Sequence, residues 1–251
     1  MLMSPFISIH RWLSLFFVLM IIAGLLGPAL VRAQSRQVLV LDVDGVINSV
    51  KERFISRAID RAEEDGATLI IIQLDTPGGL LSSTREIVQE LLESPVPIAV
   101  FVSPRGARAG SAGTFITAAG HFAVMAPGSN IGAATPISGS GEDLPDTLAS
   151  KVENDAAALI RSIADERGRN ADRLEETVRK ASSFTAIEAV ELNVVDFIAD
   201  DVDDLLAKLD GREVVTRSGT RILDTKNLEQ KDFNKNILEN FLEFISDPNV
   251  S

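Results

Sequence analysis

The sequence predicts an α/β domain built on a mostly parallel β-sheet, and two observations lead to that prediction. Four short runs consist almost wholly of apolar residues, namely residues 38–43, 68–74, 97–102 and 122–125. Such runs are typical of strands that are buried on both faces, as in a parallel sheet covered by helices. Segments with apolar residues at helical spacing, at residues 47–64 and 81–93, separate the first three runs. This alternation of strand and helix predicts crossover connections.

Shorter elements continue the pattern toward the C-terminus. We expect helices at residues 112–119, 147–167, 186–192 and 202–209, and strands at residues 194–198 and 213–216. The strand at 213–216 should be the last one, and the polar segment at 138–146 should be a surface loop. A stripe of apolar residues that begins at Phe233 and ends at Phe244 predicts an amphipathic C-terminal helix.

The amino-acid composition excludes several classes of function. The chain has 251 residues, of which 45% are hydrophobic, so it can bury one sizeable core. It contains no cysteine, which excludes disulfides, thiolate catalysis, zinc–thiolate sites and iron–sulfur clusters. A net charge of −12 and an aromatic content of 5% argue against nucleic acid as a partner. We expect no cofactor and no metal.

The N-terminal segment predicts export. Residues 13–30 form an uncharged apolar stretch that follows His10 and Arg11, and small residues end the segment at Ala33. This pattern is typical of a secretory signal peptide that is cleaved after Ala33. The alternative is an uncleaved anchor, since 18 apolar residues can just span a bilayer. We therefore divide the chain into a signal or anchor (1–33), a catalytic domain (34–216) and a C-terminal extension (217–251).

Two glycine-rich turns are candidates for chemistry. Gly78 and Gly79 follow a buried strand, where backbone amides can approach a ligand as an oxyanion hole requires. Ser111 and Ala112 open the helix at 112–119, where free amides and the helix dipole would stabilise an oxyanion. Each turn also has a structural interpretation. The glycines could serve turn geometry alone, and serine is a preferred N-cap residue.

A serine nucleophile needs a base, and the composition narrows the choice. His121 lies ten residues after Ser111, which is about 15 Å along a continuous helix and too far for a hydrogen bond. The alternative is one of seven lysines. Lys151 falls in the first turns of the helix expected at residues 147–167, at the flank of its apolar stripe, and could reach into a cleft from there. The competing interpretation is an ordinary solvated lysine.

Three segments together resemble the protease domain of the NfeD family, the membrane proteins also called stomatin-operon partner proteins. These are IIIQLDTPGG, GARAGSAGTFITAAG with the following FAVMAPGSNIGAATPI, and a lysine, Lys151, placed 40 residues after Ser111. The resemblance extends from about residue 36 to about residue 210. It implies a Clp-protease or crotonase-like fold, in which a repeated β-β-α superhelix forms a mostly parallel sheet with helices packed outside.

The same resemblance implies a serine endopeptidase with a Ser-Lys dyad. Ser111 would be the nucleophile and Lys151 the general base. The amides of Gly79 and Ala112 would form the oxyanion hole, and Gly78 would shape the turn. The family's substrates are apolar segments of stomatin-like or prohibitin-like membrane proteins, so we expect such a protein as substrate or partner.

Location and assembly follow from the export signal and the family. We expect a periplasmic or other extracytoplasmic protein that is associated with a membrane, and a homo-oligomer, most simply a dimer. Long members of the family continue into membrane spans, whereas this sequence ends at ISDPNVS. A truncated or partial chain is the simplest interpretation of that difference.

Three other functions compete with the protease. The run VLVLDVDGVI resembles the first motif of haloacid-dehalogenase-type phosphatases, with Asp42 as nucleophile and Asp44 as acid/base. Asp200 and Asp201 could complete a magnesium site there, with Lys180 as the positive partner. A crotonase that acts on acyl-coenzyme A shares the oxyanion hole, but export argues against it. The last alternative is a non-catalytic assembly partner of a membrane scaffold.

Overall fold

The computed structural model describes residues 36–137 and 145–246. The expected signal or anchor segment and most of the expected loop at 138–146 lie outside the described residues. The part of the chain that is described forms one compact unit. No helix within residues 36–137 and 145–246 combines the length and hydropathy that a membrane span requires.

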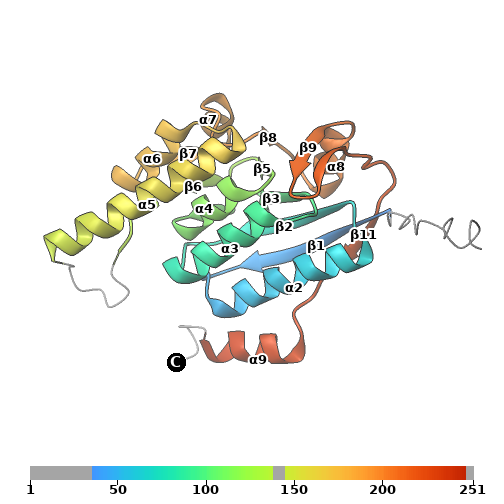
Figure 1. Cartoon of the computed structure of the whole chain (residues 1–251), viewed down its shortest axis with the longest axis horizontal. Helices are drawn as coiled ribbons and strands as arrows, with labels where there is room; N and C mark the ends of the chain where they lie inside the picture. Colours follow the sequence, from blue (N-terminus) through green and yellow to red (C-terminus); the bar gives the residue numbers. More distant parts are fainter. Residues whose placement is uncertain (1–35, 138–144, 247–251) are drawn as a thin grey trace, which may run out of the picture. The chain divides into compact units, whose positions relative to one another are not determined.

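A parallel sheet of six strands forms the centre of this unit (Figure 1). In spatial order the strands are β11 (Glu229–Asp232), β1 (Gln37–Asp44), β2 (Leu69–Asp75), β3 (Ile98–Val102), β5 (Phe122–Met125) and β8 (Phe197–Ile198). Every neighbouring pair in this sheet is parallel. The apolar runs of the sequence form β1, β2, β3 and β5, which confirms the expected α/β class.

Each face of the sheet carries its own apolar core, because successive residues of a strand point to opposite faces. On one face, Leu39 and Leu41 of β1 belong to a large core with the helices that follow the strands. These helices are α2 (Ser49–Asp65), α3 (Leu81–Glu93), α4 (Ala112–Ala119), α5 (Asp146–Arg167), α6 (Ala171–Arg179) and α7 (Ala186–Glu191). On the other face, Val38 and Val40 pack with α8 (Val202–Leu209) and the hairpin of β9 (Glu213–Thr216) and β10 (Gly219–Ile222).

Short strands missed by sequence analysis hold the turn before α4. Strands β4 (Arg108–Gly110), β6 (Asn130–Gly132) and β7 (Ser183–Thr185) form a separate three-stranded sheet. Each has only three residues, too few for an apolar period to be visible. Strand β4 ends directly before Ser111, so this small sheet fixes the position of that serine.

The C-terminal region differs from the prediction in two respects. The expectation that residues 213–216 form the last strand is wrong, since β10 and β11 follow them and β11 joins the edge of the main sheet beside β1. The four side chains of β11 are exposed, so the sequence of this strand has no apolar pattern from which it could be predicted. The C-terminal helix α9 (Ile237–Ser246) begins four residues later than expected. Phe233 precedes it and stacks on Phe54 of α2, with ring centroids 5.6 Å apart.

Candidate active site

The loop between β2 and α3 lies directly against Ser111. The amide of Gly78 donates to Oγ1 of Thr76 at 3.0 Å, and that hydroxyl donates to the carbonyl of Gly78 at 3.1 Å, so the turn is closed internally. A Cβ atom on Gly78 would lie 2.7 Å from Cβ of Ser111, and the φ angle of Gly78 is +133°. At Gly79 a Cβ atom would lie 2.1 Å from the carbonyl oxygen of Ile47. Both positions therefore require glycine, one because of Ser111 and the other because of neighbouring backbone.

Ser111 occupies the N-cap position of α4, but its side chain does not cap the helix. It precedes α4 with φ 48° and ψ −110°, and its side chain makes no capping hydrogen bond. A positive φ is costly for a residue with a Cβ atom, and such strain is concentrated at functional sites. The amide of Ser111 donates to the carbonyl of Gly132 at 3.1 Å, which ties the strained residue to β6. The side chain is half-buried, so it is held in place and still accessible.

The backbone amides of Gly79 and Ala112, which the sequence predicts as an oxyanion hole, lie in the two segments that meet at Ser111. Among the described residues, neither the amide of Gly79 nor that of Ala112 donates to another protein group. Ala112 is the first residue of α4, where helix geometry leaves the amides without intrahelical acceptors. The dipole of α4 adds partial positive charge at the same point. The turn of Gly78 thus contacts Ser111, and Ser111 itself stands at the N-terminus of α4.

Lys151 lies on α5, a helix that packs against α4, and its side chain is exposed. No hydrogen bond joins Lys151 to Ser111 in this structure. The N-terminal end of α5, which carries Lys151, projects past α3 and α4 (Figure 1). The expected nucleophile and the expected base are therefore not joined by a hydrogen bond in this conformation.

His121 is occupied elsewhere. It lies at the start of β5, and its Nδ1 atom accepts the amide of Ile98 at 3.2 Å. Burial, together with the positive charges of Arg167, Arg169 and Arg221, lowers the pKa of His121 to about 3. This histidine is thus buried at the N-terminal edge of the sheet, where it contacts the backbone of β3.

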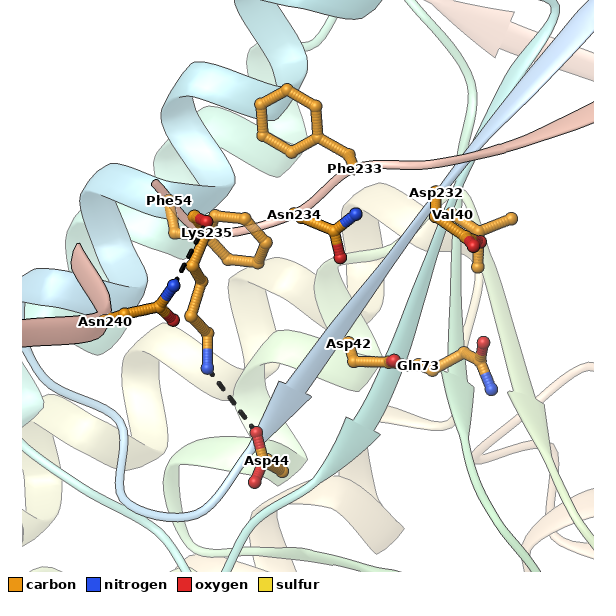
Figure 2. Close-up of a pocket in the computed structure, with 10 residues that line it drawn as sticks. All are labelled: Val40, Asp42, Asp44, Phe54, Gln73, Asp232, Phe233, Asn234, Lys235 and Asn240. Carbon is orange, nitrogen blue, oxygen red and sulfur yellow. Dashed lines mark hydrogen bonds and ion pairs between the residues drawn. The ribbon is translucent and has the colours of Figure 1, made fainter. Parts of the chain in front are cut away.

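The groups of the phosphatase alternative do not come together. Figure 2 shows Asp42 and Asp44 in a depression of about 300 Å³ over β1 and β2, where Asp44 faces Lys235 at 3.6 Å. Asp200 lines a different depression and pairs with Arg105 at 3.1 Å. Lys180 pairs with Glu176 of its own helix. Within the described part of the chain, no group of three or more histidine or acidic side chains could hold a metal ion.

The structure is similar to ClpP1 from Listeria monocytogenes, with a TM-score of 0.54 over 66% of this chain and 94% of that chain. Identity is 17%, so this likeness shows the fold alone. The fold is of the Clp-protease type, as expected.

The chain belongs to the NfeD family, because residues 37–217 match the family described as "NfeD1b, N-terminal domain". It is 37% identical over 217 residues to membrane-bound protease PH1510 of Pyrococcus horikoshii, which covers 85% of this chain and 49% of that protein. It is also 33% identical over 119 residues to membrane protein NfeD1b of Bacillus subtilis, over 47% of this chain and 26% of that one. The chain thus spans about half the length, or less, of these relatives.

Solved structures of the archaeal relative match nearly in full. One is the membrane-bound stomatin-specific protease 1510-N as a lysine-to-alanine mutant with a substrate peptide. It has a TM-score of 0.78 and 35% identity, and the match covers 86% of this chain and 99% of that chain. A serine-to-alanine mutant has a TM-score of 0.74 and 36% identity, over 80% and 99% of the two chains. The expected family and fold are confirmed, and the relative from Pyrococcus horikoshii is a protease.

Proposed function

We propose that this chain is a serine endopeptidase in which Ser111 is the nucleophile and Lys151 the general base. One observation carries the proposal: Ser111 is held with a strained backbone at a helix start, against Gly78 and beside the free amides of Gly79 and Ala112. A serine whose side chain is not used as a cap, placed next to unpaired amides, suits acyl transfer.

Each group has a defined part in the reaction. Oγ of Ser111 attacks the peptide carbonyl while the neutral amine of Lys151 takes its proton. The amides of Gly79 and Ala112 donate to the oxyanion of the tetrahedral intermediate. Lys151 then gives the proton to the leaving amine, which produces an acyl-enzyme, and in the second half it activates a water that releases Ser111. Because the two side chains share no hydrogen bond in this conformation, the first turns of α5 must approach Ser111 when a substrate binds.

Lysine is the base that the chain and its relatives support. The archaeal protease has been studied as a serine mutant and a lysine mutant at positions 41 residues apart, and Ser111 and Lys151 lie 40 residues apart here. Cysteine is absent, and His121 is committed to the backbone of Ile98. These facts support an amine as the base that serves a serine nucleophile.

The relatives also suggest a substrate and a location. Since the archaeal relative is specific for a stomatin homologue, we propose an apolar segment of a stomatin-like membrane protein as the substrate. The apolar residues 13–30 support export, to a periplasm or another extracytoplasmic face. The relatives' names support membrane association, and a homodimer is the assembly we propose.

The test is cleavage of an apolar peptide by the wild-type chain, Ser111→Ala, Lys151→Ala and the double variant. Each single substitution should lower kcat at least about 10³-fold, and the double variant should lose little more, because the two residues act as a unit. A serine-reactive phosphonate should label Ser111, and mass spectrometry of the adduct locates the label. Labelling of another residue, or full activity of Ser111→Ala, would contradict the proposal.

A non-catalytic assembly role is the second candidate, and the missing hydrogen bond between Ser111 and Lys151 favours it. A scaffold of this kind would bind a stomatin-like protein through the same surface without cleaving it. Binding that persists in Ser111→Ala and Lys151→Ala, together with a wild-type chain that never cleaves the bound protein, would establish this role in place of the protease.

A further inference from the structure

The C-terminal helix α9 is oriented with its apolar side away from the protein. Glu239 is 8% exposed and faces the body, whereas five apolar side chains are 57–90% exposed: Ile237, Leu238, Phe241, Phe244 and Ile245. At 3.6 residues per turn these five lie within an arc of about 120°. Helices that stabilise a domain bury such an arc. In α9 the arc is exposed to solvent instead.

A polar clamp fixes this orientation. Nε of Arg57 on α2 donates to Glu239 at 3.0 Å, and Nη2 of Arg57 pairs with its other carboxylate oxygen at 2.5 Å. Asn236 and Glu239 cap the start of the helix reciprocally, because the side chain of each accepts the backbone amide of the other, at 2.8 and 2.7 Å. The guanidinium of Arg57 also stacks on Phe233 at 4.4 Å. The helix lies beside α2 (Figure 1) and is held there by its polar side. Its apolar side chains are the exposed ones.

A second copy of the chain is a poor match for this surface. The five side chains expose on the order of 600 Å². Two packed helices cover only part of such an area, whereas a stable dimer needs about 800 Å² from each partner. The apolar region of a membrane, by contrast, can contact all five side chains at the same time. Exposed apolar patches of this size mark sites of interaction with a protein or a membrane.

The rest of the sequence supports a lipid bilayer as the partner of this surface. Residues 13–30 provide an apolar segment that can enter a bilayer, and the arc of α9 contains no charged residue. The chain has a net charge of −12, which repels anionic lipid and favours neutral headgroups.

We propose that α9 lies flat on a membrane with zwitterionic headgroups, with its five outward apolar side chains inserted at the boundary between headgroups and acyl chains. The inference rests on the membrane association included in the proposed function, and it names the surface that makes the contact. Binding through α9 would fix how the protease body faces the bilayer.

The absence of cysteine allows a site-specific test in the full chain. Phe241→Cys and Phe244→Cys, each labelled with an environment-sensitive fluorophore, are mixed with phosphatidylcholine vesicles. Ile222→Cys on β10 is the matched control, because Ile222 is 70% exposed and lies on the other face of the sheet. Position-specific signals separate the contact of α9 from any contact made by residues 13–30.

We expect blue-shifted emission, and quenching by lipid-attached quenchers, at positions 241 and 244 but not at 222. If vesicles leave the emission wavelength at positions 241 and 244 at its value in aqueous buffer, the proposal is overturned. A blue shift that grows with protein concentration in the absence of lipid would also overturn it, since it would show a second copy on the helix.

A double variant separates this inference from the proposed function. Phe241→Ser with Phe244→Ser should reduce the vesicle-bound fraction contributed by α9 at least about tenfold. It should leave cleavage of a soluble peptide unchanged, because the helix is outside the site of Ser111. Loss of peptide cleavage in Ser111→Ala tests the protease alone, so either proposal can fail without the other.

Discussion

At the scale of single residues, glycine is required at different positions for different physical reasons. Gly78 and Gly168 both have a positive φ, at +133° and +66°. An added Cβ at Gly78 meets Ser111 at 2.7 Å, whereas a Cβ at Gly168, the C-cap of α5, meets nothing within 4 Å. The backbone conformation is thus the whole requirement at Gly168, whereas Gly78 must also leave room for Ser111.

This difference gives a matched pair of variants. Gly168→Ala should lower the free energy of unfolding by about 1 kcal/mol, the cost of a left-handed backbone for alanine, and retain peptide cleavage. Gly78→Ala should reduce kcat at least about 100-fold, because the methyl group displaces Ser111 from the amides. Urea unfolding and peptide cleavage of both variants check this. Equal loss of activity in the two would show that stability alone, and not the position of Ser111, governs the effect.

At the scale of elements, α9 is attached by few contacts compared with the helices that cover the sheet. Its body-facing contact centres on Glu239, and the partner is Arg57 of α2. A helix of ten residues is marginal by itself in water. Its helical state therefore depends on this clamp and on whatever covers its outer face.

Arg57→Ala should release α9 and leave the body folded. Amide hydrogen exchange in residues 237–246 should accelerate at least about tenfold, while exchange in the central strands stays unchanged, because local openings are independent of the core. Arg53 is an exposed arginine on α2, the helix that carries Arg57. The control variant Arg53→Ala should change neither the exchange in α9 nor the exchange in the central strands. Exchange in α9 that is as slow in Arg57→Ala as in wild type would show that the ion pair does not hold the helix.

At the scale of the whole molecule, a buried cluster of positive charge joins separate elements at the N-terminal edge of the sheet. Arg167, near the end of α5, donates to the carbonyls of Ala119 and Leu91. Arg169 pairs with Asp196 at 2.9 Å, before β8. His121 lies among these arginines in its neutral form, because burial and their charges lower its pKa. A proton on His121 therefore works against the folded state as a whole.

The pH dependence of stability follows from that shift. The pKa of His121 is about 3 in the folded chain and 6.5 when unfolded, so the unfolded state takes up the proton first as pH falls. Stability is full above pH 6.5 and is lost below it, with a decrease of about 1.4 kcal/mol between pH 7.5 and pH 5.5. Urea unfolding at the two pH values measures this. His121→Gln should remove the decrease, and an unchanged decrease in that variant would assign it to other groups.

The sequence by itself determined the α/β class, the central strands β1, β2, β3 and β5 and the helices between them. It could do so because continuous apolar runs and helical spacing report burial directly. It also selected Ser111 as the candidate nucleophile and the glycines before α3 as its neighbours, through motifs shared with the NfeD family. These features depend on residues that are close together in the chain.

Tertiary structure alone decided the features that join distant residues. The three-residue strands around Ser111 and the exposed edge strand β11 exist because another strand is there to pair with them, and no local period encodes that. The contact of Gly78 with Ser111, the commitment of His121 to Ile98 and the outward apolar side of α9 are of the same kind. Side-chain type predicts which residues can do chemistry or be buried, but which partner each one meets depends on the packing of the whole chain.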